Sequence, residues 1–62
     1  NFSDFVNSYR IEELKQLIND PKNDNLTLLA LAFDVGFNSK ASFNRAVKKL
    51  TGKPPSDLKS KS

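Results

Sequence analysis

The 62 residues include no cysteine and no histidine, and these two absences exclude several kinds of site. Without cysteine, no disulfide can reinforce the modest core that a chain of this length forms. Only carboxylates remain as strong metal ligands, which argues against a zinc site. A Ser-His or Cys-His nucleophile is also absent, and the adjacent Glu12 and Glu13 diverge by about 100° on a helix. We therefore expect no enzymatic activity, no metal and no cofactor.

Long apolar runs and glycines are scarce as well. The longest apolar run, from Leu28 to Phe33, has six residues, far too few to span a membrane. No secretory signal pattern is present, and the lack of cysteine fits a reducing compartment, so we expect a cytoplasmic protein. The only two glycines, Gly36 and Gly52, both follow predicted helices, which leaves none for a phosphate-binding loop.

The charges that are present divide the chain into two parts of opposite sign. Residues 1–37 carry three basic and six acidic side chains, a net charge of −3. Residues 38–62 carry seven basic side chains and one acidic side chain, a net charge of +6. A polyanion that binds this protein is therefore expected to contact the second part.

Residues 27–51 have the pattern of a helix-turn-helix. Apolar side chains recur at the i, i+3, i+4, i+7 spacing of one helical face before Gly36 and again after it: Leu28, Leu31, Ala32 and Val35, then Phe43, Ala46, Val47 and Leu50. Thr27 and Ser39 are the predicted N-caps of the two helices. Gly36 is expected to take a positive φ in the turn. Such a motif lays its second helix in the major groove of DNA.

A further helix is predicted over residues 4–19, with Ser3 as its N-cap and Asp20-Pro21 at its end. Its apolar side chains fall on two faces about 140° apart on a helical wheel. The first face, here called the N-terminal stripe, comprises Phe2, Phe5, Val6 and Tyr9, and the second comprises Ile11, Leu14, Leu17 and Ile18. The second face has a partner in the helix-turn-helix, whereas the N-terminal stripe has no evident partner in this chain.

Two interpretations of the N-terminal stripe remain open. In the favoured one, its partner is a missing N-terminal subdomain, and the chain, which begins at Asn1, is a piece of a longer protein. In the other, one core buries both faces of the helix. An uncovered stripe would drive self-association. Leu29 and Phe33, on a flank of the next helix, either widen the core or contact another partner.

These patterns closely resemble the second helix-turn-helix of the DNA-binding domain of AraC/XylS family bacterial transcription regulators. The matching positions are Leu28, Leu31, Ala32, Val35, Gly36, Phe37, Ser39, Phe43, Arg45, Val47, Lys48, Lys49, Gly52 and Pro55. The helix at 4–19, with Tyr9-Arg10-Ile11 and Leu17-Ile18, resembles the linker helix between the family's two motifs. Pro54 and Leu58 depart from the family pattern, and Pro54 leaves the last short helix without a side-chain N-cap.

The resemblance implies an all-α fold with a homeodomain-like three-helix core. It places a linker helix at 4–19, the helix-turn-helix at 27–51, a short helix at 55–59 and a tail at 60–62. We expect the Lys-Ser-Lys-Ser end of the chain to be disordered. Double-stranded DNA is the implied partner, and the resemblance also allows docking to RNA polymerase.

In this family the positions matching Lys40, Ala41, Asn44 and Arg45 are expected to meet DNA. We expect Arg45 and Lys40 to contact bases, with Asn44 and Ala41 as shorter-range readers. Arginine can bond guanine in bidentate fashion, asparagine can do so with adenine, and an alanine methyl can contact that of thymine. We expect phosphate contacts from three further residues, Ser42, Lys48 and Lys49.

Alternatives remain for these residues. In one alternative, Arg45 pairs with Asp34 or another acid. In another, Arg45 contacts only the DNA backbone. Phe37 and Phe43 are predicted as core residues and not as stacking platforms for bases. The alternative function is a helical protein-interaction module that acts through the N-terminal stripe, Leu29 and Phe33.

Overall fold

The computed structural model describes residues 1–59, which form three α-helices and two short 3-10 helices. In chain order these are α1 (Phe2–Ile18), η1 (Pro21–Asn23), α2 (Leu28–Asp34), α3 (Lys40–Thr51) and η2 (Pro55–Leu58). No strand occurs in this part of the chain, so the predicted all-α class is confirmed. The tail expected at 60–62 lies outside the described residues. Over residues 1–59, no helix is both long enough and apolar enough to cross a membrane.

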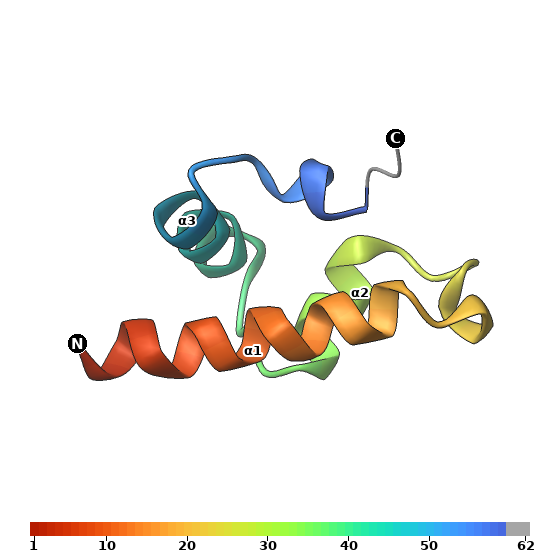
Figure 1. The fold of residues 1–62 in the computed structure, drawn as a ribbon, viewed down its shortest axis with the longest axis horizontal. Coiled ribbons are helices and arrows are strands. Elements are labelled where there is room, and N and C mark those ends of the chain that lie inside the picture. The colour runs from red at the N-terminus through yellow and green to blue at the C-terminus, as the bar shows by residue number, and fades with distance from the viewer. Residues whose placement is uncertain (60–62) are drawn as a thin grey trace.

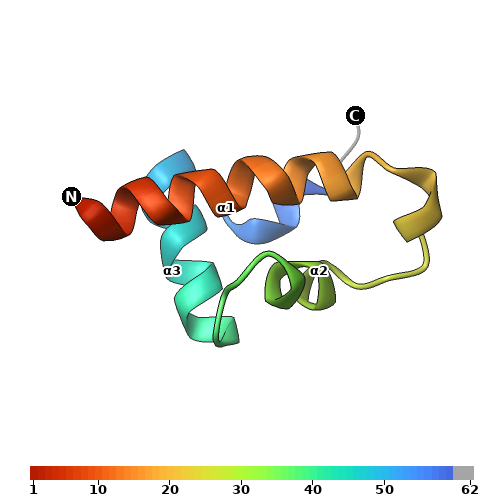
Figure 2. The ribbon, with the colours of Figure 1, turned by 90° about the horizontal axis from the view of Figure 1, so that it is seen from below.

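The core lies where α2 and α3 pack on the same side of α1 (Figures 1 and 2). Nine apolar side chains are buried there: Ile11, Leu14, Ile18, Leu31, Ala32, Phe37, Phe43, Ala46 and Val47. Leu14, Leu31 and Val47 are the largest fully buried side chains, one from each α-helix. The helix that resembles a linker is therefore itself the first helix of the three-helix core.

α1 begins two residues earlier than the sequence predicted, at Phe2 and not at residue 4. Its N-cap is Asn1, whose Oδ1 accepts a hydrogen bond of 2.9 Å from the backbone N–H of Asp4. The prediction of Ser3 as the cap was therefore wrong. Asparagine is as good an N-cap as serine, so the earlier of two suitable residues caps the helix.

The predicted caps of the helix-turn-helix are confirmed. Thr27 Oγ1 accepts from the backbone N–H of Ala30 at 3.1 Å, and Ser39 Oγ accepts from that of Ser42 at 3.1 Å. At the other end of α3, Gly52 has φ 75°, and its N–H donates to the Lys48 carbonyl at 2.9 Å. Local side-chain and glycine chemistry therefore sets both ends of α3.

The polar connector between α1 and α2 is tied to the rest of the domain by side chains. Asn23 Nδ2 donates to the Leu17 carbonyl at 2.9 Å, where α1 ends. Lys59 Nζ donates to the Leu26 carbonyl at 2.9 Å, so this first residue of the expected disordered end is anchored. The short helix predicted at 55–59 is a 3-10 helix over Pro55–Leu58, and no side chain caps it at Pro54, as predicted.

The N-terminal stripe is largely open to solvent. Phe2 is 80% exposed, and Phe5 and Tyr9 are each 67% exposed, while Val6 is half-buried. The interpretation in which one core buries both faces of the helix is therefore wrong. The stripe remains an apolar surface that nothing in residues 1–59 covers.

Two further apolar side chains depart from simple expectations. Leu50, predicted on the core face of α3, is 37% exposed, because it lies in the last turn just before the chain leaves the helix at Gly52. On α2, Leu29 packs against the core and widens it, whereas Phe33 is 48% exposed. The flank formed by this pair is therefore divided between core and surface.

Candidate nucleic-acid interface

α3 has one buried face and one face that is open to solvent. Phe43, Ala46 and Val47 point into the core. Around the rest of the helix lie six exposed residues that the sequence assigned to DNA: Lys40, Ala41, Asn44, Arg45, Lys48 and Lys49. Ala41, Arg45 and Lys48 lie opposite the core, while Lys40 and Asn44 lie on one edge of the exposed face and Lys49 lies on the other. A single partner can therefore contact all of them together.

Three of the cations on this face have no acidic partner within the described chain. Over residues 1–59, Lys40, Arg45 and Lys48 take part in no ion pair, and their side chains make no hydrogen bond. The alternative in which Arg45 pairs with Asp34 therefore finds no support in this structure. Unpaired, solvated cations on an exposed helix face suit the approach of a polyanion.

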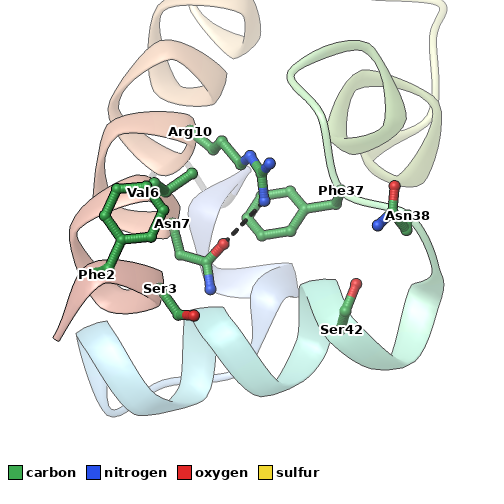
Figure 3. A pocket seen from close by; sticks show the side chains of 8 residues that line it. All are labelled: Phe2, Ser3, Val6, Asn7, Arg10, Phe37, Asn38 and Ser42. Atoms are coloured by element: carbon green, nitrogen blue, oxygen red, sulfur yellow. Dashed lines mark hydrogen bonds between the residues drawn. The ribbon is translucent and has the colours of Figure 1, made fainter.

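Ser42 differs from the other predicted contacts because its side chain is already occupied. It belongs to a capping box with Ser39: its Oγ accepts from the Ser39 N–H at 3.3 Å and donates to the Ser39 carbonyl at 3.0 Å. The residue is half-buried and faces α1 (Figure 3). A phosphate contact from this hydroxyl would require it to give up its bond to the Ser39 carbonyl.

Lys49 also differs from the other cations. Its Nζ lies 3.1 Å from Oδ1 of Asp4, in the first turn of α1. The Lys49 side chain is 58% exposed and that of Asp4 is 30% exposed, so this ion pair is partly solvated. The sequence placed Lys49 on the edge of the DNA-binding face, but its pairing with a residue 45 positions earlier is a tertiary contact that local periodicity does not encode.

The turn that orients α3 is built on Gly36 and Phe37. Gly36 has φ 117°, which confirms the predicted positive φ. The Gly36 N–H donates to the Phe33 carbonyl and the Phe37 N–H to the Ala32 carbonyl, both at 3.1 Å. This is the hydrogen-bond pattern of a Schellman motif, which ends α2 and sends the next residue inward. Phe37 is accordingly buried, with its ring centroid 5.3 Å from that of Phe43.

Arg10 holds α1 against this turn, a role that the sequence did not reveal. Its guanidinium carbon lies 5.6 Å from the centroid of the Phe37 ring, and its Nη1 donates to Asn7 Oδ1 at 3.1 Å (Figure 3). A Cβ on Gly36 would approach Arg10 Nε to 3.0 Å. Arg10 therefore covers the outer side of the turn, and a glycine lets it come close. The only sequence signal was its place in the Tyr9-Arg10-Ile11 match.

The arrangement of a Schellman turn with a buried Phe37, between a short helix and a capped basic helix, agrees with a comparison against protein families. The family model described as a helix-turn-helix domain, of the AraC type, matches residues 1–61. The chain belongs to the AraC-type helix-turn-helix family. Searches of curated proteins and of solved structures gave no match.

Membership of the AraC-type family makes this chain a DNA-binding helix-turn-helix domain. Domains of this family are not typically enzymes. Over the described residues, no group of three or more carboxylates is placed to hold a metal ion. DNA is thus the partner that family membership indicates for this domain.

Proposed function

We propose that this domain binds specific sites on duplex DNA with α3 in the major groove, as part of a bacterial transcription regulator that acts in the cytoplasm. Lys40, Ala41, Asn44 and Arg45 would contact base edges, and Lys48 and Lys49 would contact phosphates. The N-terminal part of a recognition helix reaches the bases, while more peripheral cations position the protein on the backbone.

The observation that carries this proposal is the exposed face of α3. Six residues able to contact DNA lie on the exposed side of α3, and three of their four cations, all but Lys49, have no ion-pair partner in residues 1–59. The helix that bears them is fixed at both ends, by the Ser39 cap and by Gly52. A helix whose backbone is already fixed loses little backbone entropy when it binds.

The proposal predicts that Lys48→Ala weakens binding to all duplex sequences alike. Loss of one phosphate contact is expected to reduce the slope of log affinity against log salt concentration by about one. The measurement is a salt titration of binding to labelled duplex DNA of random sequence. Lys22→Ala, which removes the same charge from η1, far from α3, is the matched control and is expected to change the slope much less. An unchanged slope for Lys48→Ala would remove this residue from the interface.

A second proposed function is protein binding through the N-terminal stripe. Its support is the exposure of Phe2, Phe5 and Tyr9 on α1, because contiguous apolar surface of this kind promotes association. The partner would be a second copy of the chain or a further part of the same protein. The family resemblance adds RNA polymerase as a candidate partner of the regulator.

Self-association through the stripe is expected at high micromolar concentration and is measured by sedimentation equilibrium. Phe5→Ser should weaken it, because it removes an exposed aromatic ring from the centre of the stripe. Leu26→Ser removes an exposed apolar side chain that lies outside the stripe and is expected to leave association unchanged. A strictly monomeric wild-type chain would count against the stripe as an association surface.

A further inference from the structure

A shallow cleft separates the first turns of α1 from the edge of α3. Six of the residues that line it are polar or charged: Ser3, Asp4, Asn7, Ser42, Arg45 and Lys49. We call it the α1–α3 cleft. The cleft adjoins the proposed DNA-binding face of α3, because Arg45 and Lys49 line the cleft and are also proposed DNA contacts. Whatever charge α1 places in this cleft therefore acts on the DNA-binding edge of α3.

The charge that α1 supplies there is negative. Asp4 Oδ1 lies 3.1 Å from Lys49 Nζ, and among residues 1–59 Asp4 is the only carboxylate that lines the cleft. The other polar residues of α1 in the cleft, Ser3 and Asn7, are neutral and point toward α3 (Figure 3). Asp4 is therefore placed to compete with any anion that approaches Lys49.

We infer that Asp4 is an affinity-setting residue for DNA: it occupies Lys49 in the free protein and lowers the affinity for duplexes of every sequence. This inference rests on the proposed function. A phosphate that reaches Lys49 must displace a carboxylate that is only 30% exposed, and the displaced carboxylate then stays close to the DNA backbone. Both effects oppose binding, and neither depends on the base sequence.

The contact is specific to Lys49 and spares the proposed base reader. Arg45 lines the same cleft but forms no ion pair with Asp4, so its guanidinium remains available for a base. Removal of the Asp4 charge should therefore change affinity and leave base preference intact. A residue that oriented Arg45 would instead change the ranking of sites.

The test is Asp4→Asn, measured by salt titration against a random-sequence duplex and against a site selected from a random pool. The affinity of the variant for both duplexes is expected to rise by about two- to fivefold at low salt, the range of an exposed ion pair. The salt slope should become steeper by up to about one, as expected when one more phosphate contact forms. Asp24→Asn is the matched control, since it adds the same net charge at the far end of the molecule, next to η1 (Figure 1).

A double-mutant cycle with Lys49→Gln shows whether Asp4 acts through Lys49. In the Lys49→Gln background, Asp4→Asn is expected to raise affinity much less than it does in the wild type. Thermal unfolding of each variant tests whether a change in stability causes the change in affinity. Only a small change in stability is expected, because the Asp4 side chain lies outside the hydrophobic core.

The outcomes separate this inference from the proposed function. If wild type and Asp4→Asn both fail to bind duplex DNA at low salt, the proposed function and the role of Asp4 are both overturned. If wild type binds and Asp4→Asn binds equally well or less well, only the role of Asp4 is overturned. Weaker binding would identify Asp4 as a residue that holds Lys49 in place for DNA.

Discussion

Leu14→Ala is expected to lower the free energy of unfolding by about 2–5 kcal/mol, the cost of truncating a buried leucine. Leu14 is 0% exposed and lies on α1, between α2 and α3. A core of this size supplies only roughly 3–5 kcal/mol of net stability. The variant should therefore lose most of its stability, which would show that α1 is an integral part of the core.

Urea denaturation followed by circular dichroism measures this effect. Leu50→Ala is the matched control, because Leu50 is a leucine on α3 that is already 37% exposed. Its loss is expected to cost far less than the loss of Leu14. If the two variants unfolded at similar urea concentrations, α1 would be a peripheral linker and the packing described above would be wrong.

Arg45→Ala is expected to weaken binding to a selected DNA site by about 1–3 kcal/mol and to relax the base preference at one position. Arg45 is exposed on α3, and no acid in residues 1–59 pairs with it. The measurement is the affinity of wild type and variant for a panel of duplexes that differ from the selected site by single base pairs.

Arg45→Lys is the matched variant, because it keeps the charge and loses the bidentate geometry. It is expected to recover part of the affinity that Arg45→Ala loses, but not the base preference. If Arg45→Ala left the ranking of the panel unchanged, Arg45 would contact the backbone alone. The reading of bases would then fall to Lys40, Ala41 and Asn44.

The helix-turn-helix was predictable because its ends are fixed by local chemistry. Thr27 and Ser39 accept hydrogen bonds from the first turns of their own helices, and Gly36 and Gly52 have the positive φ that ends a helix. Each of these residues acts within a few positions of itself in the chain. Sequence periodicity and capping rules describe that range well.

Local rules gave the wrong answer where two residues were equally suitable or where a helix ended. Asn1 and Ser3 are both good N-caps; the sequence analysis selected Ser3, whereas Asn1 caps the helix. Leu50 has the right phase for the core, but it lies in the last turn of α3, where the core no longer covers it. The position of a residue on a helical wheel gives the direction of its side chain. It does not show whether the neighbouring helices extend far enough along the axis to cover that side chain.

The contacts that define the candidate site were beyond reach of the sequence because they join distant positions. Arg10 covers Phe37 from α1, and Asp4 pairs with Lys49 across the α1–α3 cleft. Neither contact follows from spacing, since each depends on how α1 crosses the helix-turn-helix. The candidate DNA contacts could be proposed from one helix, whereas the residues that α1 packs against that helix and its turn required the tertiary structure.

The most direct test of α3 in the major groove is methylation interference on a selected DNA site. Methylation at guanine N7 modifies the major groove, whereas methylation at adenine N3 modifies the minor groove. Guanine N7 methylation within the site is expected to block binding, whereas methylation at N3 of adenines within the same site is expected to leave binding intact. Interference from adenine N3 alone would place the protein in the minor groove and contradict the proposed role of α3.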